Sequence, residues 1–368
     1  MAARQVALLC ALTAASWLLY AAASVDPEST ALLSLFRAHG GEADVHVAEV
    51  RPGLRGVVAA RDVAAGEAII SLPPTLAIQL TSTATPAPDS AAMLVRRWRT
   101  DANLTAYWQF LPKQLLTRNT FPEAALDLLQ SKAMKAYALT HQVQAEEIHR
   151  REDLAAEGIS EAEFRHANDL VSAYSFGFQV SPDERLRILM PVLDATNYGD
   201  VDDEANVEVR LTTDGGFVAV STRPISSGDE VLYSYTPACR RNDYSLFHYG
   251  FLQEKHPPRL CALDTPGGTL YDAPGLEEER DYGEGGILAT REELQRLEAL
   301  LAAFPTSEDQ DARLLLGQRG WLAAWTGAKP LSGVEQLFVR FRMLRKRALR
   351  YWIDRLQEVL DLADAQEL

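Results

Sequence analysis

Short alternating segments joined by glycine turns limit the folds open to this chain. Apolar and polar residues alternate in 207–211 and in 217–221, and Asp214-Gly215-Gly216 separates the two segments. This pattern predicts two strands of a hairpin. A further glycine turn at 225–230 leads into the apolar segment 231–235. Successive short strands without a βαβ rhythm argue against a Rossmann-type sheet.

Residues 188–198 place polar side chains directly after an apolar run. Pro191 ends the run, and Asp194 and Asn197 follow it three residues apart. We expect these two residues on one side of a single turn that Pro191 begins. Polar side chains beside apolar neighbours need hydrogen-bond partners, which a polar ligand can supply. Asp and Asn are also common turn residues without any ligand, so this stretch alone indicates only a turn.

A second unusual pattern lies nearer the N-terminus. Gly53 and Gly56 predict a turn where the backbone can approach a ligand, and residues 57–58 open a strand. The turn at 65–67 precedes another expected strand, 68–72. A glycine-rich hairpin without any function explains the same residues.

Helical patterns occupy most of the remaining chain. We expect helices at 27–39, between 91 and 156 with breaks at Pro112 and Pro122, from Ser160, and from Thr290 onward. Glu163 and Glu293 complete capping boxes with Ser160 and Thr290, and Ser307 with Gln310 predicts another.

The last expected helix, 334–362, has an apolar face and a basic run. The basic residues are Arg340, Arg342, Arg345, Lys346, Arg347 and Arg350. We interpret them as a solvated face, with a binding strip as the alternative.

The formal net charge of −15 argues against nucleic acid as a partner, because phosphate contact requires clustered Lys and Arg. No Cys-His cluster predicts a zinc site, and we expect no metal. Cys239 and Cys261 either pair or stay reduced.

The N-terminus resembles a targeting signal. Arg4 precedes the apolar run 6–23, and Ala21-x-Ala23 offers small residues for cleavage before Ser24. We expect residues 1–23 to be a signal peptide, with an uncleaved membrane anchor as the alternative. Cleavage predicts entry into the secretory pathway, to the endoplasmic reticulum, the exterior or a plastid, without stable membrane association.

Three segments together resemble a SET domain. Gly53-x-Arg55-Gly56 is similar to its opening, Pro191-x-x-Asp194-x-x-Asn197 to its cofactor segment, and 228–235 with 248–251 to its closing segment. The helical regions make the chain similar to the Rubisco large-subunit lysine methyltransferase type, which includes the actin-histidine methyltransferase. The likeness spans about 32–360.

The resemblance implies an α+β fold in two parts. A β-rich SET domain is expected at 32–255, with a helical insert at about 91–178. A mostly helical substrate-binding domain is expected at 280–365.

The resemblance also implies S-adenosylmethionine as methyl donor, a lysine side chain of a protein substrate as acceptor, and a monomer. It assigns Tyr235 as the active-site tyrosine and Tyr249 to the acceptor channel. The residues that it assigns to the cofactor are Arg55 and Gly56 through their backbone, Asp194 through its carbonyl, and Ala173, Tyr174, Asn197 and Tyr198.

Two positions depart from the family pattern. Tyr198 stands where the family has His, and Ala173-Tyr174 stands where it has Ser-Arg. Ala173 keeps a backbone carbonyl, but Tyr174 lacks the charge that pairs with the cofactor carboxylate. A catalytically silent scaffold that binds a protein partner is therefore an alternative, and a histidine acceptor is another. Asn197 and Tyr235 favour the enzyme over the scaffold.

Overall fold

The computed structural model describes residues 26–200, 204–235, 241–254, 259–264, 283–317 and 330–366. The chain forms two compact units. The first comprises Met1–Lys113 and Tyr174–Tyr235, and the second comprises Gln114–Ala173 and Thr236–Leu368. The expected signal peptide and Cys239 lie outside the described residues, and the domain limits expected from the sequence stay a prediction.

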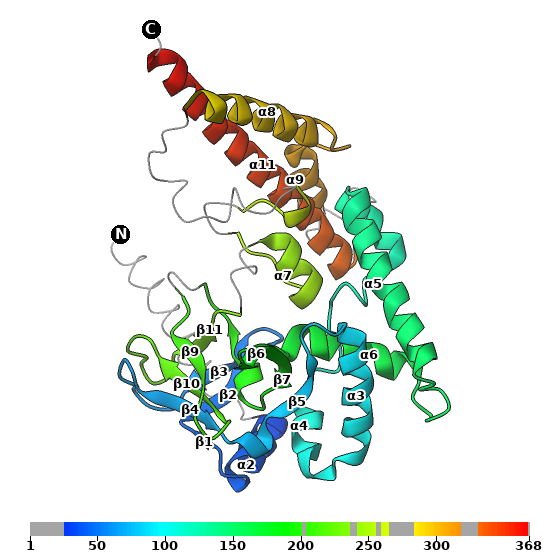
Figure 1. Cartoon of the computed structure of the whole chain (residues 1–368), viewed down its shortest axis with the longest axis vertical. Helices are drawn as coiled ribbons and strands as arrows, with labels where there is room; N and C mark the ends of the chain where they lie inside the picture. The colour runs from blue at the N-terminus through cyan, green and yellow to red at the C-terminus, as the bar shows by residue number, and fades with distance from the viewer. Residues whose placement is uncertain are drawn as a thin grey trace, which may run out of the picture. The chain divides into compact units, whose positions relative to one another are not determined.

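A mixed β-sheet of eight described strands forms the centre of the first unit (Figure 1). The strand order is β1-β4-β10-β9-β11-β3-β2, and β8 pairs with β11. The strands are β1 (Glu42–Ala43), β2 (Val45–Arg51), β3 (Leu54–Ala59), β4 (Ala68–Leu72), β8 (Asn197–Tyr198), β9 (Val207–Leu211), β10 (Phe217–Ser221) and β11 (Glu230–Tyr233). The predicted hairpin of 207–211 and 217–221 is confirmed, because β9 and β10 pair antiparallel over these residues.

A second sheet of three strands has the order β5-β7-β6. It contains β5 (Ile78–Ser82), β6 (Phe176–Ser181) and β7 (Glu184–Leu189). The sequence analysis assigned no strand here, and the expected insert ran to residue 178. The helical pattern ends at Tyr174, and half-buried and exposed residues then alternate along β6 with the two-residue period of a strand.

Among the described residues of the first unit, three α-helices accompany these sheets: α2 (Pro27–Ala38), α3 (Ala87–Thr100) and α4 (Thr105–Phe110). The helix expected at 27–39 is confirmed as α2. Asp26 caps its N-terminus by accepting the Glu28 N–H at 3.2 Å, and Leu32 and Phe36 are fully buried.

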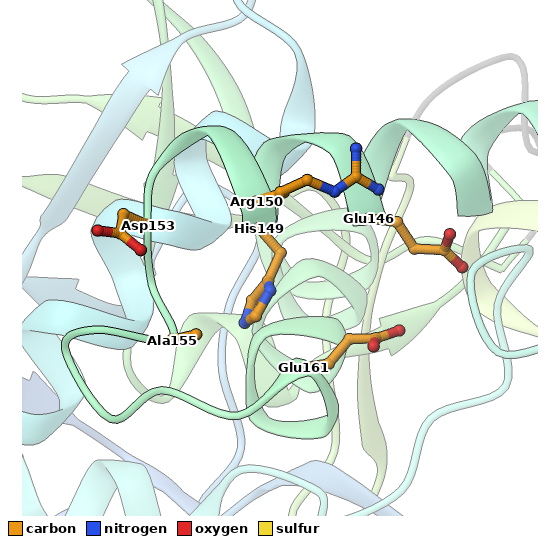
Figure 2. Close-up of a pocket in the computed structure, with 6 residues that line it drawn as sticks. All are labelled: Glu146, His149, Arg150, Asp153, Ala155 and Glu161. Atoms are coloured by element: carbon orange, nitrogen blue, oxygen red, sulfur yellow. The ribbon is translucent and has the colours of Figure 1, made fainter.

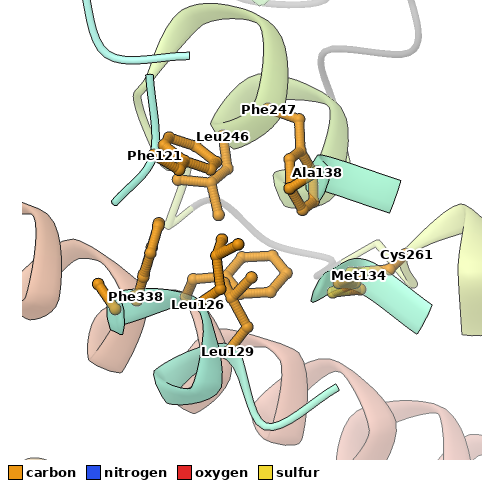
Figure 3. Packing of buried hydrophobic residues seen from close by; sticks show 11 residues of the cluster. Phe121, Leu126, Leu129, Met134, Ala138, Leu246, Phe247, Cys261 and Phe338 are labelled. Atoms are coloured by element: carbon orange, nitrogen blue, oxygen red, sulfur yellow. The ribbon is translucent and has the colours of Figure 1, made fainter. Parts of the chain in front are cut away.

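The second unit is helical in its described residues. Its helices are α5 (Lys132–Arg151), α6 (Glu161–Tyr174, whose last residue belongs to the first unit), α7 (Asn242–Tyr249), α8 (Gly283–Ala302), α9 (Glu308–Leu316) and α11 (Gly333–Gln366). An apolar cluster joins α5, α7 and α11 with the 3-10 helix Glu123–Leu129 (Figure 3). Within it, the Phe121 ring meets the Phe338 ring edge-on at 4.9 Å. An α+β fold with a helical C-terminal region is therefore confirmed.

Helix starts in this unit are only partly as expected. The Ser307–Gln310 capping box is present at α9. The expected start at Thr290 is wrong, because α8 begins at Gly283. The capping-box pattern therefore occurs inside a helix, where Thr290 is buried.

The basic run on α11 is not a solvated face throughout, which corrects the interpretation from the sequence. Arg342 and Lys346 are buried and both contact Asp311, at 2.7 and 2.5 Å. Arg345 is buried against Asp264. Because these acids lie on other segments, the pattern of α11 alone could not reveal them.

Within the described residues, none of the helices has the length and apolar character needed to span a membrane.

Candidate active site

The side chain of Asn197 links three strands of the first unit. Its Nδ2 donates to the carbonyl oxygen of Arg55 at 3.0 Å and to Oε1 of Glu230 at 2.7 Å. Both partners are acceptors, which fixes the orientation of the amide. Asn197 is half-buried, and its Oδ1 accepts no hydrogen bond from the described residues. The amide therefore presents an open acceptor beside the backbone of Arg55.

Gly56 makes this contact possible. A Cβ added at this position would lie 2.7 Å from Nδ2 of Asn197 and 2.7 Å from Oε1 of Glu230. Real Cβ atoms essentially never come this close to another atom, so the Asn197 amide and the Glu230 carboxylate would have to shift out of their hydrogen bond. The structure therefore brings together Arg55, Gly56 and Asn197, all three of which the sequence assigned to the cofactor.

Tyr235 lies beside the same stretch of backbone. Its hydroxyl donates to the carbonyl oxygen of Thr196 at 2.8 Å. Its ring meets the ring of Tyr198 at 5.6 Å with an interplanar angle of 70°. Parallel pairing of β8 with β11 places Asn197 and Tyr198 opposite Leu232 and Tyr233, which precede Tyr235. Tyr235, Asn197 and Tyr198 are therefore neighbours, as the resemblance implies.

Asp194 is buried in a short 3-10 helix, Leu193–Ala195. The hydroxyl of Tyr107 donates to its Oδ2, whereas Oδ1 has no hydrogen-bond partner among the described residues. Burial raises the pKa of the Asp194 carboxyl to about 8, so the carboxyl carries a proton at neutral pH. The expected shared turn with Asn197 is not what forms, because Asp194 contacts α4 and Asn197 contacts β3 and β11.

Tyr174 belongs to the same electrostatic cluster. Burial and the neighbouring Asp194 raise the pKa of the Tyr174 hydroxyl to about 12, and Arg55 opposes that rise. The hydroxyl is therefore a neutral donor, with Asp194 and Arg55 both within electrostatic range.

The guanidinium of Arg55 is held at the edge of this cluster. Its Nη1 lies 3.4 Å from Asp26 and 3.2 Å from Glu28, and its Nη2 donates to the carbonyl oxygen of Phe110. The group also stacks 4.1 Å above the Phe110 ring. About 30% of the side chain remains exposed.

Ala173 and Tyr249 belong to the second unit, and their predicted roles at the cofactor and in the acceptor channel stay predictions. Tyr249 is the last residue of α7, before Gly250 in the left-handed conformation. Its ring lies 6.2 Å from Tyr244 and 6.0 Å from Phe251, within an aromatic cluster of that unit.

Sequence reasoning missed three residues that organise the site. Glu230 accepts from Asn197, and Tyr107 donates to Asp194. Asn206 accepts the Leu232 N–H at 2.8 Å and donates to the Glu230 carbonyl at 2.9 Å, which fixes β11. Glu230 lies in the segment 228–235 that resembles the closing segment, in which the resemblance gave a role only to Tyr235. Tyr107 and Asn206 gave no local signal, because their partners are distant in sequence.

A separate hollow of about 370 Å³ lies in the second unit, at the α5 end and α6 start (Figure 2). Its lining residues are Glu146, His149, Arg150, Asp153, Ala155 and Glu161. None of the predicted site residues lines it. No metal-binding group of three or more His, Cys, Asp or Glu occurs within the described ranges.

Solved structures resemble this arrangement closely in fold. "Structure of Rubisco LSMT bound to AdoMet" matches with a TM-score of 0.64 and 15% identity, over 91% of this chain and 93% of that one. "Crystal structure of the SET domain of LSMT bound to MeLysine and AdoHcy" matches with a TM-score of 0.63 and 15% identity, over 92% of this chain and 93% of that one. The chain has the SET-domain fold of Rubisco LSMT. A third similar structure, of Rubisco LSMT bound to sinefungin and monomethyllysine, has a TM-score of 0.61 at 15% identity, over 93% and 92%.

No family model and no curated protein matches the sequence. The SET fold is therefore carried by the arrangement of the strands and helices rather than by residue identity. The expected family type is confirmed at the level of the fold.

Proposed function

We propose that this chain is a protein methyltransferase that uses S-adenosylmethionine and transfers a methyl group to a lysine side chain. The proposal combines the SET fold with the site around Asn197 and Tyr235. The similar structures carry AdoMet, AdoHcy or sinefungin, and two of them carry a methylated lysine.

One observation carries the proposal. Both amide hydrogens of Asn197 are used by acceptors of the protein, so its half-buried Oδ1 is left to accept from a ligand donor. S-adenosylmethionine offers donors of this kind on its adenine and its ammonium group. The same side chain holds the Arg55 carbonyl beside Gly56, where the absence of a Cβ leaves room for the Asn197 amide. The residues present therefore fit the cofactor.

The acceptor lysine must lose a proton before it can attack. At neutral pH this costs about 4–5 kcal/mol from the ordinary lysine pKa. When bound, S-adenosylmethionine supplies an electrophilic methyl group on a sulfonium. Burial beside the Tyr235 and Tyr198 rings disfavours the ammonium form and so reduces the cost.

Alignment is the main task of the protein in an in-line methyl transfer. The hydroxyl of Tyr235 is fixed on the Thr196 carbonyl, so its oxygen keeps one position and can accept a weak CH···O contact. The described residues supply this alignment through β8 and β11, whose pairing sets Tyr235 and Asn197 side by side.

Methyl transfer to a protein extract tests the proposal. The full chain is incubated with S-adenosylmethionine labelled in its methyl group, and the labelled protein is hydrolysed to amino acids. We expect label in methylated lysine. Label in methylhistidine would keep the methyltransferase and replace its acceptor. Absence of label from all amino acids, together with capture of a protein partner, would favour the catalytically silent scaffold.

A further inference from the structure

The side chain of Arg55 has a role that neither its backbone contacts nor the SET fold assigns. The amino-acid end of S-adenosylmethionine carries a carboxylate, and a carboxylate leaving water needs a cation or several donors. Position 174, where the resemblance implies an arginine, holds a tyrosine. Another cation of the first unit can meet this need if the unit binds this end of the molecule.

Arg55 is anchored at the correct place for this task. Its carbonyl oxygen accepts from Asn197 at 3.0 Å, so its backbone is part of the site. Its guanidinium stacks on the Phe110 ring at 4.1 Å, which holds the plane of the group. At about 30% exposure the guanidinium remains reachable from solvent.

The guanidinium also has donor capacity left. Nη1 faces Asp26 and Glu28, and Nη2 donates to the Phe110 carbonyl, whereas the Nε–H has no partner among the described residues. The two ion pairs are partly exposed, and pairs of this kind contribute little to stability. A ligand carboxylate can therefore join or replace them at small cost.

Arg55 is the cation of this cluster, and its two acidic partners, Asp26 and Glu28, are both partly exposed. Burial raises the pKa of both Asp194 and Tyr174, so both are neutral at pH 7. Neither group repels an anion, and the Tyr174 hydroxyl is a donor within electrostatic range of Arg55. A ligand carboxylate therefore competes only with Asp26 and Glu28 for the guanidinium, because Asp194 and Tyr174 are neutral.

We propose that the guanidinium of Arg55 binds the carboxylate at the amino-acid end of S-adenosylmethionine. The assignment rests on the proposed function. In this chain Arg55 then supplies the positive charge that Tyr174 cannot supply.

The test compares S-adenosylmethionine with its decarboxylated form, which differs only in the carboxylate. Calorimetric titration measures the dissociation constant of each ligand for wild type, Arg55→Ala, Arg55→Lys and Arg61→Ala. Arg61 is the matched control, because it lies just past β3 and also contacts two carboxylates, Asp44 at 2.7 Å and Glu67 at 2.6 Å. Thermal unfolding of each variant reports whether it remains folded.

We expect wild type and Arg61→Ala to prefer S-adenosylmethionine over the decarboxylated form by roughly 10- to 100-fold, as for a charged hydrogen bond. Arg55→Ala should lose this preference and bind both ligands alike, and Arg55→Lys should keep part of it. Equal weakening of both ligands by Arg55→Ala would show a structural role only and overturn the assignment. Wild type that binds neither ligand would instead overturn the proposed function, and the assignment with it.

Discussion

The hydroxyl of Tyr235 donates a hydrogen bond to the carbonyl oxygen of Thr196 at 2.8 Å. This contact joins the residue that follows β11 to the residue that precedes β8. It fixes the phenol oxygen next to Asn197, whose amide is itself held by Arg55 and Glu230. The hydroxyl and the open amide acceptor therefore form one rigid arrangement.

Tyr235→Phe should slow methyl transfer while leaving S-adenosylmethionine binding intact. The substitution removes one oxygen and keeps the ring that packs on Tyr198. We expect a loss of roughly 100-fold in rate, the usual effect of removing one aligned polar contact to a transition state. Tyr233→Phe, at the last residue of β11, is the control and should retain activity. Equal rates for Tyr235→Phe and wild type would contradict the assigned role.

Gly56→Ala should destabilise the first unit and weaken S-adenosylmethionine binding. The new methyl group would meet Asn197 and Glu230 at 2.7 Å, so the amide would have to move. Overpacking of this kind costs about 1–3 kcal/mol of unfolding free energy. Gly333→Ala is the control, because a Cβ there meets nothing within 4 Å. Urea denaturation measures the unfolding free energy of both variants. A Gly56→Ala protein as stable as wild type would show that the site is loosely packed.

Asp194→Asn should change how stability depends on pH. Burial raises the pKa of the folded carboxyl to about 8, above its ordinary value of 3.8. The folded protein therefore keeps this proton between about pH 4 and 8 while the unfolded chain releases it, so this group lowers stability as pH rises.

The amide of Asp194→Asn cannot titrate, so the variant should gain stability relative to wild type as pH rises from 5 to 8. We expect a relative gain of at least about 1 kcal/mol, measured by urea denaturation at both values. A difference between the proteins that is constant with pH would mean that Asp194 is ionised in the folded state.

Asp311→Ala should strongly destabilise the second unit. It would leave Arg342 and Lys346 buried without their carboxylate, which costs about 3–5 kcal/mol. Glu308→Ala is the matched control, because the side chains of its partners Arg347 and Arg350 are 42% and 53% exposed and the loss should be less than about 1 kcal/mol. Similar losses for the two variants, measured by urea denaturation, would contradict the burial of this network.

The sequence predicted local patterns well and long-range contacts poorly. The strands 207–211 and 217–221 were predicted with their exact limits, because alternation and a glycine turn are local signals. Gly56 and Asn197 were selected by motif, and the structure explains why no Cβ fits beside that amide. The strand β5 was missed because its partner β7 lies about a hundred residues away, and β6 was missed because the expected helical insert ran into it.

The same limit applies to polar side chains. Nothing near Tyr107 indicates that it donates to Asp194, 87 residues away. Arg342 and Lys346 were read as solvated because the helix pattern does not contain Asp311. Ion-pair and hydrogen-bond partners that are distant in sequence are brought together only by the packed structure, so the sequence pattern alone does not indicate them.

The most direct test of the central claim is a calorimetric titration of S-adenosylmethionine into the purified wild-type protein. The proposed function predicts saturable one-to-one binding that Asn197→Ala weakens, because that variant loses the open acceptor and the link to Arg55. Absence of binding by wild type at millimolar S-adenosylmethionine would contradict the claim.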